Sequence, residues 1–194
     1  QDALIEMSKQ ISTNTNNTNS NNSNNNSHNQ TTNNSFNLQF FLNETCKNAM
    51  NIMEFVDTVK LQLSDLEAVG ELGYIDGISN IIIQNLKELD IDKRPVHCTD
   101  AKRDVLYVKD DNKWEKENED YNKIRKAIKY ISNKNINLIP EWKKKNPDCI
   151  KYDSKKSDIC NNIIIEAMGG RNLTTKLSED KIIKKIAKEM TIDK

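Results

Sequence analysis

The sequence is poor in the residues that build disulfide frameworks and tight turns, with four cysteines, five glycines and three prolines among 194 residues. It contains no run of about 18 apolar residues, so no transmembrane helix is predicted. Residues 1–11 lack a basic stretch followed by an apolar run, so no secretory signal is predicted and we expect an intracellular protein without a membrane partner. Basic and acidic side chains both total 29, so any attraction to a polyanion must be regional.

The cysteines are too far apart for a zinc site. Cys46, Cys98, Cys149 and Cys160 never approach one another closely in the sequence, whereas zinc ligands come in pairs about two to four residues apart. Without a secretory signal a disulfide framework is not expected either. The sequence therefore predicts reduced, packed thiols, no metal and no cofactor. The alternative is that the cysteines make one intermolecular or metal contact.

Composition divides the chain into three parts. From residue 13 to 35 every residue is Asn, Ser, Thr, Gln or His, and Asn takes 12 of the 23 positions, so these residues are predicted to be a disordered linker. Residues 1–12 have apolar side chains at helical spacing, and we expect a short helical remnant of an element that begins upstream. Residues 36–194 are predicted to form a single globular domain.

The pattern within residues 36–194 predicts an α+β fold that is mainly helical. Asn43 is a candidate N-cap for the first helix. Gly70, Gly73 and Gly77 predict that a short helix there breaks or packs closely. Apolar residues alternate at about residues 95–117 between polar turns, which predicts one small antiparallel β-hairpin or meander. Helical periodicity returns after residue 121.

Charge is unevenly distributed along this domain. Residues 42–92 carry three basic and ten acidic side chains, whereas residues 121–156 carry eleven basic and three acidic ones. These runs are typical of solvated helix faces or of segments that pack against each other. Alternatively, the cations form one basic surface that follows a phosphate backbone, with Tyr130 and Trp142 interleaved to stack on bases. The residues predicted for that surface are Lys123, Arg125, Lys126, Lys129, Lys134, Trp142, Lys143, Lys144 and Lys145.

The stretch 93–103 combines a histidine, a thiol and a carboxylate with several cations. One interpretation is structural, with Asp100 capping a turn and His97 hydrogen-bonding across the meander. A second is catalytic, with His97 and Asp100 at the centre of a nuclease-like enzyme, although no phosphate-binding glycine loop accompanies them. A third is contact with nucleic acid through Arg94, His97, Lys102 and Arg103.

Residues 36–55, 73–117 and 186–194 resemble an uncharacterised domain of giant DNA viruses that infect amoebae and other protists. In that family the domain commonly follows an Asn-rich spacer and, further upstream, a zinc-finger-like motif. This sequence has the spacer but not the finger. The resemblance implies a viral origin, a place in the host cytoplasm, the viral factory or the virion, and a nucleic-acid association. It assigns no catalytic residue.

Three hypotheses follow. The first is a non-enzymatic viral accessory protein that binds DNA or RNA or has a regulatory role. The second is a protein-interaction or assembly module, whose acidic half meets the basic half of another copy, or which binds a viral or host protein. The third is the nuclease-like enzyme.

Overall fold

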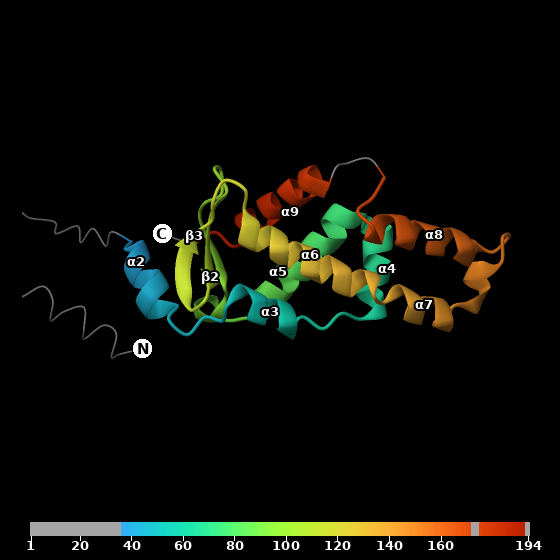
Figure 1. Ribbon diagram of the computed structural model, residues 1–194, viewed down its shortest axis with the longest axis horizontal. Helices are drawn as coiled ribbons and strands as arrows, with labels where there is room; N and C mark the ends of the chain where they lie inside the picture. Colours follow the sequence, from blue (N-terminus) through green and yellow to red (C-terminus); the bar gives the residue numbers. More distant parts are fainter. Residues whose placement is uncertain (1–35, 172–174, 193–194) are drawn as a thin grey trace, which may run out of the picture. The chain divides into compact units, whose positions relative to one another are not determined.

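Helices and one small sheet make up residues 36–171 and 175–192, which are the residues that the computed structural model describes (Figure 1). This arrangement confirms the predicted α+β class, dominated by helices. The predicted helical remnant at 1–12 and the linker at 13–35 lie outside the described residues. None of the described helices has the length and apolar character needed to cross a bilayer.

The predicted meander is confirmed as a three-stranded antiparallel sheet in the order β1-β2-β3. The two-residue turn between β2 and β3 is formed by Asp111 and Asn112, both with positive φ, a conformation that favours Asn and Asp in tight hairpins. Cys98 of β1 pairs with Leu106, and both are buried against the helices. The strands are β1 (Val96–Asp100), β2 (Val105–Asp110) and β3 (Lys113–Lys116).

Three long helices supply the largest shares of the core, and each buries an apolar stripe at helical spacing. They are α5 (Tyr74–Lys87), α6 (Asn122–Ile136) and α9 (Thr175–Glu189). The end of α9 is tied to the sheet, because the Cys98 amide donates to the Met190 carbonyl at 2.8 Å and the Ile192 amide to the Cys98 carbonyl at 2.9 Å. These bonds cover the free edge of β1.

The glycine cluster breaks one helix and packs closely, as predicted. Gly73 has φ +86° and separates α4 (Leu63–Leu72) from α5. A Cβ placed on Gly70 would lie 2.6 Å from the Ile163 side chain, and one on Gly77 would lie 2.6 Å from the Val69 Cα. These glycines therefore allow α4 to approach its neighbours more closely than any larger residue would.

The prediction of a helix starting at Asn43 is wrong. Instead, α2 (Leu38–Phe40) continues into the wide turn η2 (Phe41–Thr45), and α3 (Ile52–Thr58) begins after Asn51. Asn51 and Glu54 form a capping box, in which the Asn51 amide donates to the Glu54 carboxylate at 2.8 Å. The chain between these helices lies against the sheet, because the Lys109 ammonium donates to the Lys47 carbonyl at 2.6 Å and the Trp114 indole to the Cys46 carbonyl at 3.4 Å.

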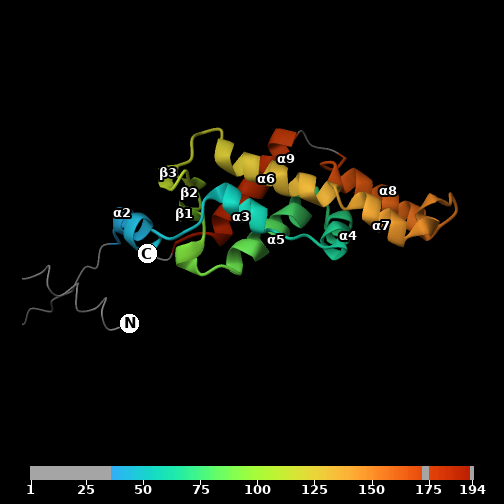
Figure 2. The ribbon, with the colours of Figure 1, turned by 60° about the horizontal axis from the view of Figure 1, so that its bottom comes forward.

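After α6 the chain forms a helical hairpin of α7 (Ile139–Lys145), η4 (Pro147–Ile150) and α8 (Lys155–Ala167). The prolines at 140 and 147 stand at the starts of its first two elements, where a missing N–H is tolerated. Figures 1 and 2 agree that this hairpin and the sheet lie at opposite ends of α6. The short helix η3 (Ile91–Lys93) lies elsewhere, just before β1.

Candidate nucleic-acid interface

The predicted basic surface is divided between the two ends of α6. A helix of 15 residues is about 22 Å long at roughly 1.5 Å per residue. Lys123 lies in its first turn, next to the sheet, whereas Lys143 to Lys145 follow its far end. These cations therefore do not form one continuous patch.

At the sheet end, carboxylates neutralise Lys123. Its ammonium hydrogen-bonds Glu115 and lies 3.7 Å from Asp110. The hydrogen bond from Lys123 lowers the pKa of the Glu115 carboxyl. A phosphate would have to compete with both carboxylates to reach this lysine.

Arg125 is neutralised more completely. Its guanidinium donates to Glu179 at 2.8 Å and also to Asp180, while Nε donates to the Asp120 carbonyl at 2.7 Å. The side chains of Arg125 and Glu179 are only 16% and 12% exposed. Arg125 therefore joins α6 to α9 instead of facing solvent.

The rest of α6 presents fewer free cations than its sequence suggests. The Lys134 ammonium donates to the Val56 carbonyl at 2.6 Å and to the Val59 carbonyl at 3.1 Å, so it closes the end of α3. Lys126 and Lys129 are exposed and make no ion pair with the described residues. These two lysines remain available to a ligand, but they lie apart from the lysines that follow the far end of α6.

Two predicted contact residues are buried, which corrects the prediction that nucleic acid touches them. Trp142 is 3% exposed and donates its indole N–H to Glu67 at 2.7 Å, so its ring cannot stack on a base. His97 is 2% exposed.

His97 is enclosed by the N-terminal segment and the sheet. Its Nε2 lies 3.5 Å from the Cys46 sulfur, and its ring packs 5.0 Å from Phe41 and 5.4 Å from Trp114. Burial, helped by the charge of Arg94, lowers the pKa of His97 to about 4, and burial raises the pKa of Cys46 to about 11. The pair is therefore a neutral imidazole beside a neutral thiol, which is not an activated nucleophile.

Asp100 caps the β1–β2 turn, as the structural interpretation predicted. It accepts hydrogen bonds from the Lys102 amide at 2.9 Å and the Arg103 amide at 3.2 Å. No hydrogen bond joins His97 to Asp100 in the part of the chain that the structure describes, and His97 bonds to Cys46 instead of across the meander. The two residues do not form a catalytic dyad.

The β1–β2 turn nevertheless exposes two of the predicted cations. Lys102 is exposed, and Arg103 is exposed with a loose contact of 3.8 Å to Asp100. Arg94 is half-buried and donates to the Leu89 carbonyl at 3.1 Å, so its role is to hold the chain before β1.

The densest group of free cations lies at the end of the helical hairpin, and we call residues 143–156 the α7–α8 tip. They include six lysines and two aspartates. Two of the lysines form exposed local ion pairs, Lys145 with Glu141 at 2.9 Å and Lys151 with Asp148 at 2.6 Å. Among residues 36–171 and 175–192 no carboxylate pairs with Lys143, Lys144, Lys155 or Lys156.

The α7–α8 tip also exposes apolar side chains that the sequence analysis did not single out. Tyr152 is fully exposed and Ile150 is 84% exposed, both between the lysines of α7 and those of α8. Ser154 holds this loop, because its hydroxyl caps α8 by accepting from the Lys156 amide at 3.1 Å. The signal in the sequence is a tyrosine in a lysine-rich segment without helical periodicity, between Lys151 and Asp153.

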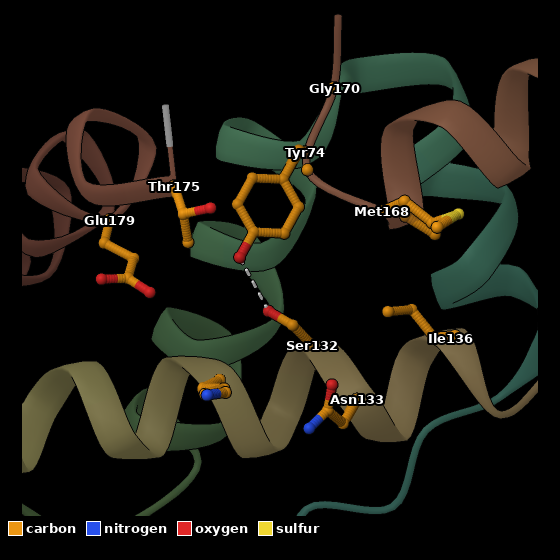
Figure 3. Close-up of a pocket in the computed structure, with 11 residues that line it drawn as sticks. Tyr74, Ser132, Asn133, Ile136, Met168, Gly170, Thr175 and Glu179 are labelled. Atoms are coloured by element: carbon orange, nitrogen blue, oxygen red, sulfur yellow. Dashed lines mark hydrogen bonds between the residues drawn. The ribbon is translucent and has the colours of Figure 1, made fainter. Parts of the chain in front are cut away.

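A pocket lies between α5, α6, α8 and α9 (Figure 3). The hydroxyl groups of Tyr74 and Ser132 are 3.1 Å apart and hydrogen-bond each other, as the dashed line shows. Burial raises the pKa of Tyr74, and the Glu179 carboxylate is already bound to Arg125. The polar groups of this pocket thus hold the helices together and leave no paired acid and base.

Comparisons with protein-family models, with curated proteins and with solved structures found no match. The resemblance to the giant-virus domain therefore stays a prediction. Within the described residues, no three His, Cys, Asp or Glu side chains gather in a way that could hold a metal ion.

Proposed function

We propose that the protein binds single-stranded nucleic acid through the α7–α8 tip. The observation that carries this proposal is a fully exposed tyrosine on the loop between α7 and α8, whose adjoining ends carry four lysines without a carboxylate partner among the described residues. Sequence-tolerant binders of single strands combine a cationic track for phosphates with an aromatic ring on which a base stacks. Tyr152 takes the stacking role that the sequence assigned to Trp142.

The tip favours a single strand over a duplex. Unpaired bases expose their faces, and a tyrosine on a short loop reaches such a face, whereas bases within a duplex are stacked on one another. Reading a major groove requires a recognition helix with several base-contacting side chains, whereas the tip presents the last turn of α7, a helix of only seven residues. DNA and RNA strands offer the same phosphates and ring faces, so both are expected to bind.

The salt dependence of binding tests the electrostatic part. If Lys143, Lys144, Lys155 and Lys156 contact about four phosphates, affinity for a labelled single strand falls roughly 50-fold between 50 and 200 mM salt. Replacing Tyr152 with Ala removes the stacking platform and weakens binding about tenfold. Fluorescence anisotropy with labelled oligonucleotides measures both effects.

Tyr130→Ala is the matched control, because Tyr130 is a half-exposed tyrosine on α6, outside the tip. It should leave affinity unchanged. An affinity that ignores salt, or that falls equally in both tyrosine variants, would contradict the proposal.

A further inference from the structure

A pocket of about 320 Å³ opens beside the α7–α8 tip, between α4, α7 and α8. Its lining includes the apolar side chains of Ile159, Ile163 and Trp142. Two residues of the tip, Asn146 and Lys156, also line it. The pocket is therefore continuous with the cationic surface and large enough for a small planar ligand.

Two carboxylates from α4 face this pocket although it adjoins a cationic surface. Glu67 and Glu71 stand one helical turn apart and both line it. One oxygen of Glu67 accepts the Trp142 indole N–H at 2.7 Å, and no group among the described residues bonds to the other oxygen. Glu71 makes no hydrogen bond or ion pair with the described residues. Carboxylates repel phosphate, so in this place they suit a ligand that presents N–H donors.

The pocket thus combines an apolar wall, carboxylate acceptors and, at its rim, the Lys156 ammonium, which hydrogen-bonds the Asn146 side chain. A nucleotide matches all three features, with its base against Ile159, the exposed side chain of that wall, its donor edge toward the carboxylates and its phosphate near Lys156. Guanine presents two adjacent donors, N1–H and the N2 amino group, which fit the two oxygens of one carboxylate in parallel. Adenine, cytosine and uracil lack this pair of adjacent donors.

We propose that this pocket receives one unstacked base of the bound strand and prefers guanine, with Glu71 accepting from its donor edge. This inference rests on the proposed function of the tip. Lys156 belongs to both surfaces, so the phosphate next to the inserted base stays in contact with the cationic track. The pocket thereby gives base preference to a surface that would otherwise bind any strand.

The test compares an oligothymidylate strand with a strand of equal length that carries guanine at alternate positions. We expect the guanine strand to bind at least fivefold more tightly at the same salt concentration. Glu71→Gln keeps the size of the side chain but removes its charge and one acceptor, so it should abolish the preference while the oligothymidylate affinity changes less than twofold. Glu88→Gln, at an exposed position after α5, is the matched control and should keep the preference.

The outcomes separate this inference from the proposed function. Equal binding of both strands, with the expected salt dependence, overturns the guanine pocket and leaves the tip as a strand-binding surface. Absence of binding to either strand overturns both proposals. Free guanosine monophosphate should compete for the pocket only weakly, and tight binding of the nucleotide without a strand preference would overturn the assignment of the occupant. Ile159→Trp, which fills the pocket mouth, should give the same loss of preference as Glu71→Gln.

Discussion

The two ends of α6 use their cations in opposite ways. At the sheet end, Arg125 and Lys123 are paired with carboxylates from β2, β3 and α9, and the Arg125 pair is mostly buried. At the far end, Lys143 and Lys144 are exposed and unpaired within the described residues. The comparison teaches that a net charge counted along a segment does not measure the charge available to a ligand. What decides availability is whether a carboxylate from elsewhere in the chain reaches the cation.

Replacing Arg125 with Met gives the largest expected effect on stability. The change leaves Glu179 nearly buried without its partner, and we expect a loss of about 3 kcal/mol in the free energy of unfolding. Lys144→Met, at the exposed end, should change it by less than about 0.5 kcal/mol. Urea unfolding followed by circular dichroism measures both.

The loss of affinity for single-stranded nucleic acid should rank the same two variants in the opposite order. Lys144→Met weakens binding and lowers its salt dependence, whereas Arg125→Met leaves the affinity of the folded protein unchanged. If Arg125→Met had no effect on stability but reduced binding, the two ends would not differ in the way described.

A second prediction concerns how low pH changes the folding stability through His97, at the sheet end of the molecule. The pKa of His97 is about 4 in the folded protein against an ordinary 6.5, because burial disfavours the charged imidazolium. The unfolded chain therefore binds more protons between these values, and stability falls as the pH drops below 6.5. From pH 7 to pH 4.5 this residue alone should remove about 2 kcal/mol of folding free energy.

His97→Phe isolates this effect, because phenylalanine keeps the aromatic packing against Phe41 and Trp114 but cannot be protonated. Urea unfolding at several pH values should show a shallower loss of stability on acidification in this variant than in the wild type. Identical pH profiles would mean that His97 is not held neutral by its surroundings. Variants of the α7–α8 tip should keep the wild-type profile.

Much of the fold follows from local pattern. Alternating apolar residues predicted the meander around Val96 and Val105, and helical stripes predicted the core helices, because both features depend on which face of an element is buried. The close packing at Gly70 was also predicted, since few other reasons place three glycines so near one another in a helical segment. The start of the first helix was missed, because the capping box at Asn51 competes with the candidate cap at Asn43.

The candidate site was predictable only in part, because its key contacts are remote in the sequence. Trp142 sits between Glu141 and Lys143, as an exposed residue would, and it is buried because α7 packs against α4, where Glu67 accepts its indole N–H. The partner of His97 is likewise Cys46, on a segment whose course over the sheet no local pattern indicates. Lys143 and Lys144 were predicted to lie at the surface and do so.

The smallest expected effect comes from loosening the hairpin that carries the α7–α8 tip. In Gly70→Ala the new methyl group would lie 2.6 Å from the Ile163 side chain and 3.2 Å from its Cα, so α8 must move away from α4. Overpacking costs roughly 2 kcal/mol and the better helix propensity of alanine returns about 1 kcal/mol, so the net loss of stability should be about 1 kcal/mol. Ser64→Ala, on an exposed position of the same helix, reports the propensity effect alone and should not destabilise.

Because the displacement in Gly70→Ala lies at the tip end, the affinity for single-stranded nucleic acid should fall slightly. The loss of stability at low pH that His97 causes should stay the same. A Gly70→Ala protein as stable as the wild type would show that α4 and α8 can separate freely, and the tip would then not be a surface held rigidly by the core.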